Sequence, residues 1–230
     1  MKAAGIDTPE WQLCATGREK LKAFRYPVIV KPNAEGTSKG ITAASVVHDE
    51  ASARAAVRTL VEKYDQPALI EEYIQGREFT VGLIGEKRPR VLPIMEIVFL
   101  SGSKTPVYGF EEKKEFTDRV RNDCPAVLTG AEQKKLEKVA RDTFSALDCR
   151  DVARVDIRVD ASGTPYVIEV NPLPGLAPDF SDLAVIAKQA GMDHKTLVGE
   201  ILAGAIKRRD QERSARAPEK GPTTLVPPAG

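Results

Sequence analysis

Histidine and cysteine are scarce in this sequence. Its 230 residues include two histidines, His48 and His194, and three cysteines, none of them in C-x-x-C spacing. This cysteine usage indicates neither a disulfide framework nor a zinc site. With two histidines we expect no Ser-His-Asp triad and no histidine-ligated transition metal. The chemistry must therefore depend on carboxylates, lysines, arginines and backbone groups.

The sequence also lacks a strong net charge and a long apolar run. A formal net charge of +1 gives no electrostatic reason to expect a nucleic-acid or membrane partner. No apolar segment follows a basic N-terminus, and none reaches the roughly 20 residues that cross a membrane. We therefore expect a globular cytoplasmic protein, whose 42% hydrophobic residues suffice for one large core or two small ones.

Hydrophobic periodicity predicts a chain of mixed helices and strands. Helices are expected at 49–64, 129–147, 179–190 and 193–209, and the capping-box spacing of Thr16 and Glu19 predicts another as far as Phe24. Strands are expected at 11–15, 26–31, 41–46, 67–74, 77–84 and 91–99. Residues 101–125 show no clear period, and from residue 211 the composition predicts a disordered tail.

The stretch 151–175 carries the strongest functional signal. Two runs of alternating apolar and polar residues flank residues 161–164 and predict a β-hairpin. Counting outward from the turn pairs Ile157 with Ile168, Asp156 with Glu169, and Arg154 with Asn171. Because alternate side chains point to opposite faces of a strand, one face should be apolar and the other polar. The expected apolar face consists of Val155, Ile157, Val159, Ile168 and Val170, and the polar face of Arg154, Asp156, Glu169 and Asn171.

Two carboxylates opposite each other need a compensating charge. With Cβ atoms about 5 Å apart, Asp156 and Glu169 repel each other by roughly 3 kcal/mol at an effective dielectric near 20. One alternative is a solvated face neutralised by Arg154 and Arg158. The other is a divalent cation held by the two carboxylates and the amide oxygen of Asn171, a ligand set that suits Mg²⁺ bridging phosphates. The Pro-Leu-Pro-Gly run that follows stops the strand and favours the cation.

The loop 32–40, PNAEGTSKG, follows a predicted strand that ends at Lys31. Small residues, hydroxyls and two glycines suit a loop whose backbone N–H groups cap phosphate oxygens. The same residue types also form ordinary hairpin loops. The spacing does not match G-x-x-x-x-G-K-[ST], and a strand is expected to follow, so a Walker-type site is excluded.

Four segments together resemble the D-alanine:D-alanine ligase family of ATP-grasp enzymes. They are VIVKPNAEGTSKGI, ALIEEYIQGREFTVGLIG, YGFEEK and ARVDIRVDASGTPYVIEVNPLPGL, and the resemblance extends over about residues 5–209. It implies an α+β, ATP-grasp fold in which two α+β subdomains with antiparallel sheets clamp a nucleotide. The implied organisation is an N-terminal subdomain at 1–85, a C-terminal subdomain at 86–210, and the tail at 211–230.

The resemblance also implies roles for individual residues, with ATP and Mg²⁺ (or Mn²⁺) as cofactors. The implied metal ligands are Asp156, Glu169 and Asn171. Arg154 would stabilise a tetrahedral intermediate, Gly175 would offer its N–H to the oxyanion, and Lys113 would contact a phosphate. The implied nucleotide contacts are Lys31 at the phosphates, Glu35, Gly36, Thr37 and Ser38 in a closing loop, Glu71, Glu72, Tyr73 and Ile74 at the adenine, and Glu78 at the ribose.

Three departures from the family pattern bear on the expected activity. The family's N-terminal domain, and a further ATP lysine, belong upstream of the first residue of this sequence. The loop that presents a serine to the second amino acid reads LAPDFS here, and Lys114 stands where tyrosine is common. These departures bear on whether the chain ligates alone and on whether D-alanine is its substrate.

Two functions are therefore expected. The first is an ATP-dependent carboxylate–amine ligase that acts through an acyl phosphate, as in the synthesis of the peptidoglycan precursor dipeptide. The alternative is a truncated or accessory ATP-binding module that does not ligate alone. The expected partners are small-molecule amino acids, and a second copy of the chain or a separately encoded N-terminal domain.

Overall fold

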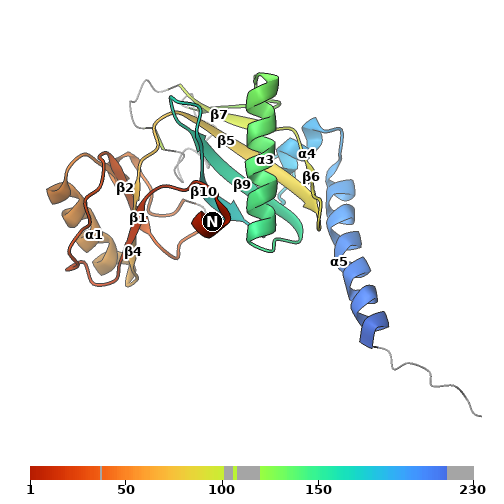
Figure 1. The fold of residues 1–230 in the computed structure, drawn as a ribbon, viewed down its shortest axis with the longest axis horizontal. Coiled ribbons are helices and arrows are strands. Elements are labelled where there is room, and N and C mark those ends of the chain that lie inside the picture. Colours follow the sequence, from red (N-terminus) through yellow and green to blue (C-terminus); the bar gives the residue numbers. More distant parts are fainter. Residues whose placement is uncertain (37, 101–105, 108–119, 217–230) are drawn as a thin grey trace, which may run out of the picture.

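The computed structural model describes residues 1–36, 38–100, 106–107 and 120–216, and these residues form two antiparallel sheets (Figure 1). The four-stranded sheet has the order β1-β4-β2-β3, with β1 Trp11–Cys14, β2 Val28–Pro32, β3 Val46–Val47 and β4 Ala68–Glu72. The six-stranded sheet has the order β10-β9-β5-β7-β8, and β6 pairs with β5. Its strands are β5 Arg77–Gly85, β6 Arg90–Val91, β7 Met95–Phe99, β8 Val120–Asp123, β9 Asp151–Val159 and β10 Pro165–Asn171.

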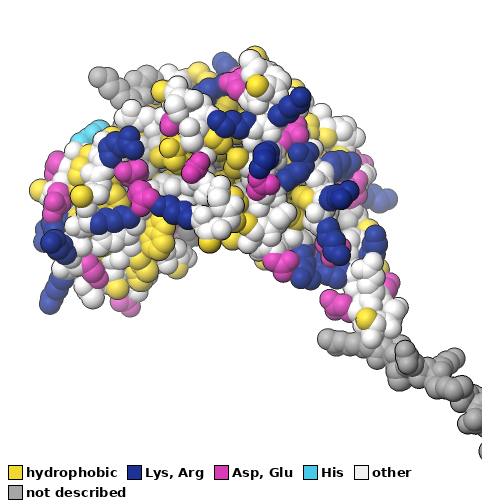
Figure 2. All heavy atoms as spheres, in the orientation of Figure 1, with side chains coloured by type: hydrophobic (Ala, Val, Ile, Leu, Met, Phe, Trp, Pro, Cys, Tyr) yellow, Lys and Arg dark blue, Asp and Glu magenta, His cyan; other side chains and the backbone are white. Residues whose placement is uncertain are grey.

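Helices cover both sheets and confirm the α+β class. They are α1 Glu50–Tyr64, α3 Gly130–Ala146, α4 Asp182–Gln189 and α5 His194–Arg216, with short 3₁₀ turns at Lys2–Ala4 and Ala43–Ser45. Among the described residues no helix is both long enough and apolar enough to span a membrane. Acidic and basic side chains are interspersed over the face shown in Figure 2, in agreement with the near-neutral net charge.

Helix α1 packs on one face of the four-stranded sheet. Asp49 caps it by accepting a hydrogen bond from the backbone N–H of Ser52 at 2.8 Å. The buried core beneath it contains Val28, Val30, Ala53, Val57, Ala68 and Ile70. Because strand side chains alternate, burying Val28 and Val30 turns Ile29 and Lys31 to the opposite face. That face looks toward the six-stranded sheet.

The six-stranded sheet is packed on both faces. Helix α3 covers one face, where Phe79, Val81, Val155 and Ile157 meet Leu136 and Phe144. Helices α4 and α5 cover only part of the other face, where Leu183, Ile186 and Leu197 pack on Ile84 and Met95. Beyond these helices the same face turns polar and carries Glu78, Thr80, Arg154, Asp156 and Arg158. The side of the sheet that faces the first sheet is therefore the polar one.

The chain crosses between the two sheets at two neighbouring places. Ile6 is buried in the core of the second sheet, and the carbonyl of Asp7 accepts from the N–H of Val167 at 3.0 Å, before β1 enters the first sheet. The chain returns between Glu72 and Arg77. The N–H of Glu72 donates to the carbonyl of Glu10 at 2.8 Å, so the two crossings lie side by side. The subdomain boundary expected at residue 85 stays a prediction, although the pairing of β5 with β9 favours a boundary near residue 75.

Three predictions of secondary structure are wrong. No helix follows Thr16, although the predicted capping contact with Glu19 forms. Gly17 has φ +73, which no α-helix accommodates in its first turn. The strand expected at 41–46 is a 3₁₀ turn, Ala43–Ser45, leading into β3. The disordered tail expected from residue 211 is wrong for residues 211–216, which continue α5, while 217–230 lie outside the described residues.

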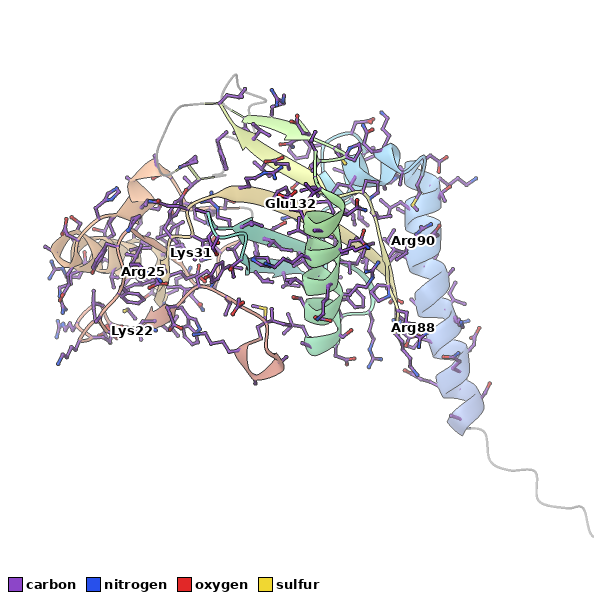
Figure 3. All side chains as sticks on the ribbon, turned by 45° about the horizontal axis from the view of Figure 1, so that its top comes forward. Lys22, Arg25, Lys31, Arg88, Arg90 and Glu132 are labelled. Carbon is purple, nitrogen blue, oxygen red and sulfur yellow. The ribbon has the colours of Figure 1, made fainter. Side chains whose placement is uncertain are left out.

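Two ion pairs fasten α5 to the second sheet. Arg90 beside the helix in Figure 3 contacts Glu200 at 2.6 Å. Arg208 donates two hydrogen bonds, of 2.7 and 2.6 Å, to the two carboxylate oxygens of Asp151. The bidentate contact raises the pKa of Arg208, because the carboxylate of Asp151 stabilises the charged guanidinium. Helix α5 is therefore anchored at both β6 and the start of β9.

We predict that Gly76→Ala strongly destabilises the protein. Gly76 has φ +147, and a Cβ atom there would lie 1.9 Å from the carbonyl oxygen of Val159. The strain and the clash together should lower the free energy of unfolding by more than about 3 kcal/mol. Gly199→Ala in α5, where a Cβ atom would meet nothing within 4 Å, is the matched control. Chemical denaturation should show a neutral or stabilised control, and a fully stable Gly76→Ala variant would contradict the prediction.

We also predict that Glu19 contributes to stability in a pH-dependent way. The backbone N–H of Thr16 donates to Glu19 Oε1 at 2.7 Å and lowers the pKa of Glu19 from 4.5 to about 2. The contribution is complete above pH 4.5 and is lost as the pH falls through 2. Glu19→Gln should therefore reduce the dependence of stability on pH between these values, by less than about 1 kcal/mol because the site is solvent-screened. Identical acid-unfolding profiles for the two proteins would refute this.

Candidate active site

A cleft lies between the polar faces of the two sheets. Its volume, including the solvent at its open side, is about 750 Å³. On one side the cleft is lined by residues of β2 and β4, and by residues 73 and 74 in the crossing that follows β4. On the other side it is lined by residues of β5, β9 and β10 and by the first residue of α4. The lining residues include Ile29, Lys31, Ser38, Ile41, Glu71, Glu72, Tyr73, Ile74, Glu78, Thr80, Val107, Arg154, Asp156, Arg158, Ile168, Glu169 and Asp182.

The structure brings most of the predicted site residues into this one cleft. Lys31 lies on the four-stranded sheet, on the side nearest the second sheet (Figure 3), and its Nζ atom is 2.5 Å from Glu71 Oε2. The predicted residues that line the cleft are Lys31, Ser38, Glu71, Glu72, Tyr73, Ile74, Glu78, Arg154, Asp156 and Glu169. Residues more than 130 positions apart in the sequence therefore share one site.

Six predicted residues are placed elsewhere or are not described. Glu35 contacts Lys39 at 2.9 Å and accepts from Gln66 at 3.0 Å, outside the cleft lining. Gly36, Asn171 and Gly175 are also outside the lining, although Asn171 Nδ2 donates to Asp156 Oδ2 at 3.2 Å. Thr37 and Lys113 lie outside the described residues. The roles implied for these six residues, and for the ten that line the cleft, stay predictions.

The β9–β10 hairpin has the predicted register around the carboxylates. Asp156 pairs with Glu169 and Arg154 with Asn171, as expected. The predicted pairing of Ile157 with Ile168 is wrong, because Ile157 pairs with Val167 and a bulge leaves Ile168 as an extra residue. The bulge reverses the alternation, so that Val167 is fully buried in the core while Ile168 joins Glu169 in the cleft.

Asp156 is the most heavily contacted carboxylate of the cleft. It accepts hydrogen bonds from Thr80 Oγ1 at 3.0 Å, from Arg154 Nε and Nη2 at 3.0 and 2.9 Å, and from Asn171. Arg154 also contacts Asp182 through Nη1 at 3.2 Å. Asp156 is 8% exposed whereas Glu169 is exposed, so this face is only partly withdrawn from water. Arg154 offsets the repulsion between its acidic neighbours.

The charge of Arg154 is stabilised by its surroundings. Burial disfavours the charged guanidinium, but the carboxylates of Asp156, Asp182 and Glu169 outweigh this effect and raise the pKa of Arg154 above its usual value. Arg154 therefore stays cationic at any physiological pH. A permanent positive charge at this position can stabilise an oxyanion that develops beside it.

The described residues contain no group of three or more His, Cys, Asp or Glu side chains arranged to hold a metal. Two opposed carboxylates with an amide beside them are still a suitable partial ligand set for Mg²⁺, which usually binds one or two carboxylates plus phosphate oxygens and water. The residues present therefore fit a metal that arrives with a phosphate group, rather than one held by protein alone.

Three polar residues that line the cleft, Thr80, Arg158 and Asp182, were not predicted from the sequence as functional positions. Thr80 and Arg158 share the alternation of Asp156 along β5 and β9, which could have revealed them. Asp182, at the start of α4, carries no such signal because its place depends on how the helix packs. From the sequence, Arg158 is expected only to neutralise the charges of Asp156 and Glu169. In the structure it contacts Glu78 instead, at 2.8 and 2.7 Å.

Comparisons with known proteins agree with this geometry. Residues 1–203 match the model of the family described as "D-ala D-ala ligase C-terminus". An uncharacterised protein of Sinorhizobium fredii is 38% identical over 90% of this chain and 60% of its own length. A D-alanine--D-alanine ligase of Alcanivorax borkumensis is 36% identical over 90% of this chain and 62% of its own.

Solved structures show the same fold. The D-alanine--D-alanine ligase of Bacillus anthracis, crystallised in complex with ATP, superposes with a TM-score of 0.72 at 27% identity, and the match covers 92% of this chain and 64% of that one. The ATP-grasp, α+β fold expected from the sequence is thereby confirmed. In these three comparisons the chain spans between 60% and 64% of the relative's length.

Proposed function

This chain belongs to the D-Ala–D-Ala ligase C-terminal family, and from that membership we propose that it is the nucleotide-binding and catalytic part of an ATP-dependent carboxylate–amine ligase. One observation carries the proposal. Asp156 faces Glu169 on adjacent strands, inside a cleft that also contains Lys31 and Arg154. A purely structural sheet has no use for opposed carboxylates in this position.

We propose that ATP binds with its base near Tyr73 and Ile74, its ribose near Glu78 and its phosphates near Lys31. Lys31 and Arg154 supply positive charge at opposite walls of the cleft, and Ser38 adds a polar group at the loop that follows β2. The relative of Bacillus anthracis named above was crystallised with ATP, which supports this assignment. Mg²⁺ held by Asp156, Glu169 and Asn171 would neutralise the phosphate oxygens.

The proposed reaction transfers a phosphoryl group from ATP to a substrate carboxylate, and an amine then displaces phosphate from the acyl phosphate. The first step brings two anions together, the carboxylate and the triphosphate, and the chain's contribution to it is positive charge and positioning. In the second step the amine is held against the acyl phosphate, and it gives up a proton as the C–N bond forms and phosphate leaves. Neither His48 nor His194 lines the cleft, and His194 Nε2 instead lies 2.8 Å from the carbonyl oxygen of Leu176. We propose that Arg154 stabilises the tetrahedral intermediate and that Gly175 offers its N–H to the oxyanion.

The substrates that we propose are D-alanine or a similar small amino acid, as in the synthesis of the peptidoglycan dipeptide, in the cytoplasm. The alternative is a module that binds ATP but needs another polypeptide, such as a separately encoded N-terminal domain or a second copy of the chain. The chain spans 60% and 62% of the lengths of the two curated relatives named above.

We predict that Glu169→Gln removes metal-dependent ATP turnover and weakens metal-dependent nucleotide binding but leaves the fold intact. Loss of one carboxylate should weaken Mg²⁺-dependent ATP affinity by about 10- to 100-fold, as other changes at metal sites do. Calorimetric titration with Mg²⁺–ATP and a thermal melt would measure both effects. Glu137→Gln in α3, outside the cleft, is the control. Wild-type affinity in Glu169→Gln would remove the metal assignment.

We predict that amino acids stimulate phosphate release from ATP. A panel of D- and L-amino acids, assayed for inorganic phosphate, should identify the substrate class, with small D-amino acids giving the largest stimulation. Tight ATP binding with no stimulation by any amino acid would support the module that needs another polypeptide. Absence of ATP binding would overturn both functions.

A further inference from the structure

Arg158 is the most deeply buried cation of the cleft. Its side chain is 5% exposed, and the guanidinium donates to Glu78 Oε2 from Nε at 2.8 Å and from Nη2 at 2.7 Å. It also donates to the carbonyl of Ile74 at 3.0 Å and to that of Pro106 at 2.8 Å. The ring of Tyr73 lies 4.6 Å from the guanidinium carbon. One side chain of β9 therefore contacts four other places along the cleft.

These contacts fix the orientation of Glu78. Both hydrogen bonds from Arg158 end on the same oxygen, Oε2, and arrive from a planar group with fixed geometry. The carboxylate therefore cannot turn without breaking both bonds. Burial alone would disfavour the charge of Arg158, but Glu78 and Tyr73 outweigh burial and raise the pKa of Arg158. The guanidinium of Arg158 therefore keeps its positive charge inside the cleft.

The same side chain joins segments that are distant in the sequence. Ile74 lies in the crossing between the sheets, and Pro106 adjoins Val107, which also lines the cleft. The Pro106 carbonyl accepts from both Arg158 and the hydroxyl of Tyr73. Through these hydrogen bonds Arg158 links β9 both to the crossing at Ile74 and to Pro106.

We propose that Arg158 is a positioning residue for sugar recognition: it holds Glu78 and the adjoining backbone where the ribose hydroxyls of a bound nucleotide must meet them. This inference rests on the proposed function, since it needs a nucleotide in the cleft. It adds a residue that contributes to selectivity between ribose and deoxyribose. A role in folding alone would not require that one guanidinium orient an acidic side chain of the cleft.

The chain offers a matched ion pair outside the cleft. Arg77 contacts both carboxylate oxygens of Glu96 at 2.8 and 2.7 Å, donates to the carbonyl of Val127 at 2.9 Å, and lies 4.8 Å from the ring of Phe79. Its contacts resemble those of Arg158, yet neither Arg77 nor Glu96 lines the cleft. Arg77→Met therefore removes a similar network without touching the site.

The test compares the affinities of ATP and 2′-deoxy-ATP, each with Mg²⁺, by calorimetry on the full chain. The wild type should bind ATP about 10-fold or more tightly than the deoxynucleotide, as expected for loss of a hydrogen bond to a charged group. Arg158→Met should reduce this ratio to within about 2-fold, and Arg158→Lys should give an intermediate ratio because an ammonium cannot hold all the partners at once. Arg77→Met should keep the wild-type ratio.

Each outcome decides the matter. A ratio in Arg158→Met equal to that of the wild type would overturn the inference, as would a wild type that does not distinguish the two nucleotides. If Arg158→Met does not fold, Arg158→Lys, which keeps a positive charge beside Glu78, provides the ratio. Failure of every protein to bind either nucleotide would instead defeat the proposed function.

Discussion

The pairing of Asp156 with Glu169 is the interaction around which the rest of the cleft is arranged. Two carboxylates on adjacent strands, of which Asp156 is buried and Glu169 is exposed, are stabilised by positive charge nearby. Arg154 provides it in the structure, held between Asp156 and Asp182. A cation bound with phosphate would compete for the same oxygens of Asp156. Either the guanidinium of Arg154 or a cation bound with phosphate can therefore neutralise the carboxylate of Asp156.

One face of the second sheet serves two purposes. Beneath α4 and α5 it is apolar, and Gly82 lets Leu183 approach so closely that a Cβ atom there would lie 2.7 Å from the leucine Cδ1. Where the helices end, the same strands carry the charged residues of the cleft. Rigid packing at one end of β5 and β9 thus fixes charged side chains at the other. This arrangement places the site on strands rather than on loops, which favours precise geometry.

The sequence allowed the class, most elements and the central pairing to be predicted, because period and turn chemistry are local properties. The pairs Asp156–Glu169 and Arg154–Asn171 follow from counting outward from a turn. The bulge at Ile168 could not be predicted by counting from the turn, because it depends on whether Val167 or Ile168 packs into the core. The helix after Thr16 failed because one left-handed glycine overrides a capping pattern. Asp182 and the partners of Arg158 come from packing between distant segments, which no short pattern records.

The two crossings between the sheets have a mechanical consequence. Residues 7–10 and 73–76 run between the same two bodies, and the hydrogen bond from Glu72 to Glu10 keeps them adjacent. Two bodies joined by a single segment of chain can rotate about it in any direction, whereas two neighbouring segments restrict the rotation to a hinge axis that passes through both. The four-stranded sheet can then swing toward the second sheet mainly about the line through both strands. Lys31 belongs to the four-stranded sheet, and Asp156 and Glu169 belong to the second sheet. Movement about the two crossings would therefore change the separation between the lysine and the two acids, in directions that the covalent path of the chain limits.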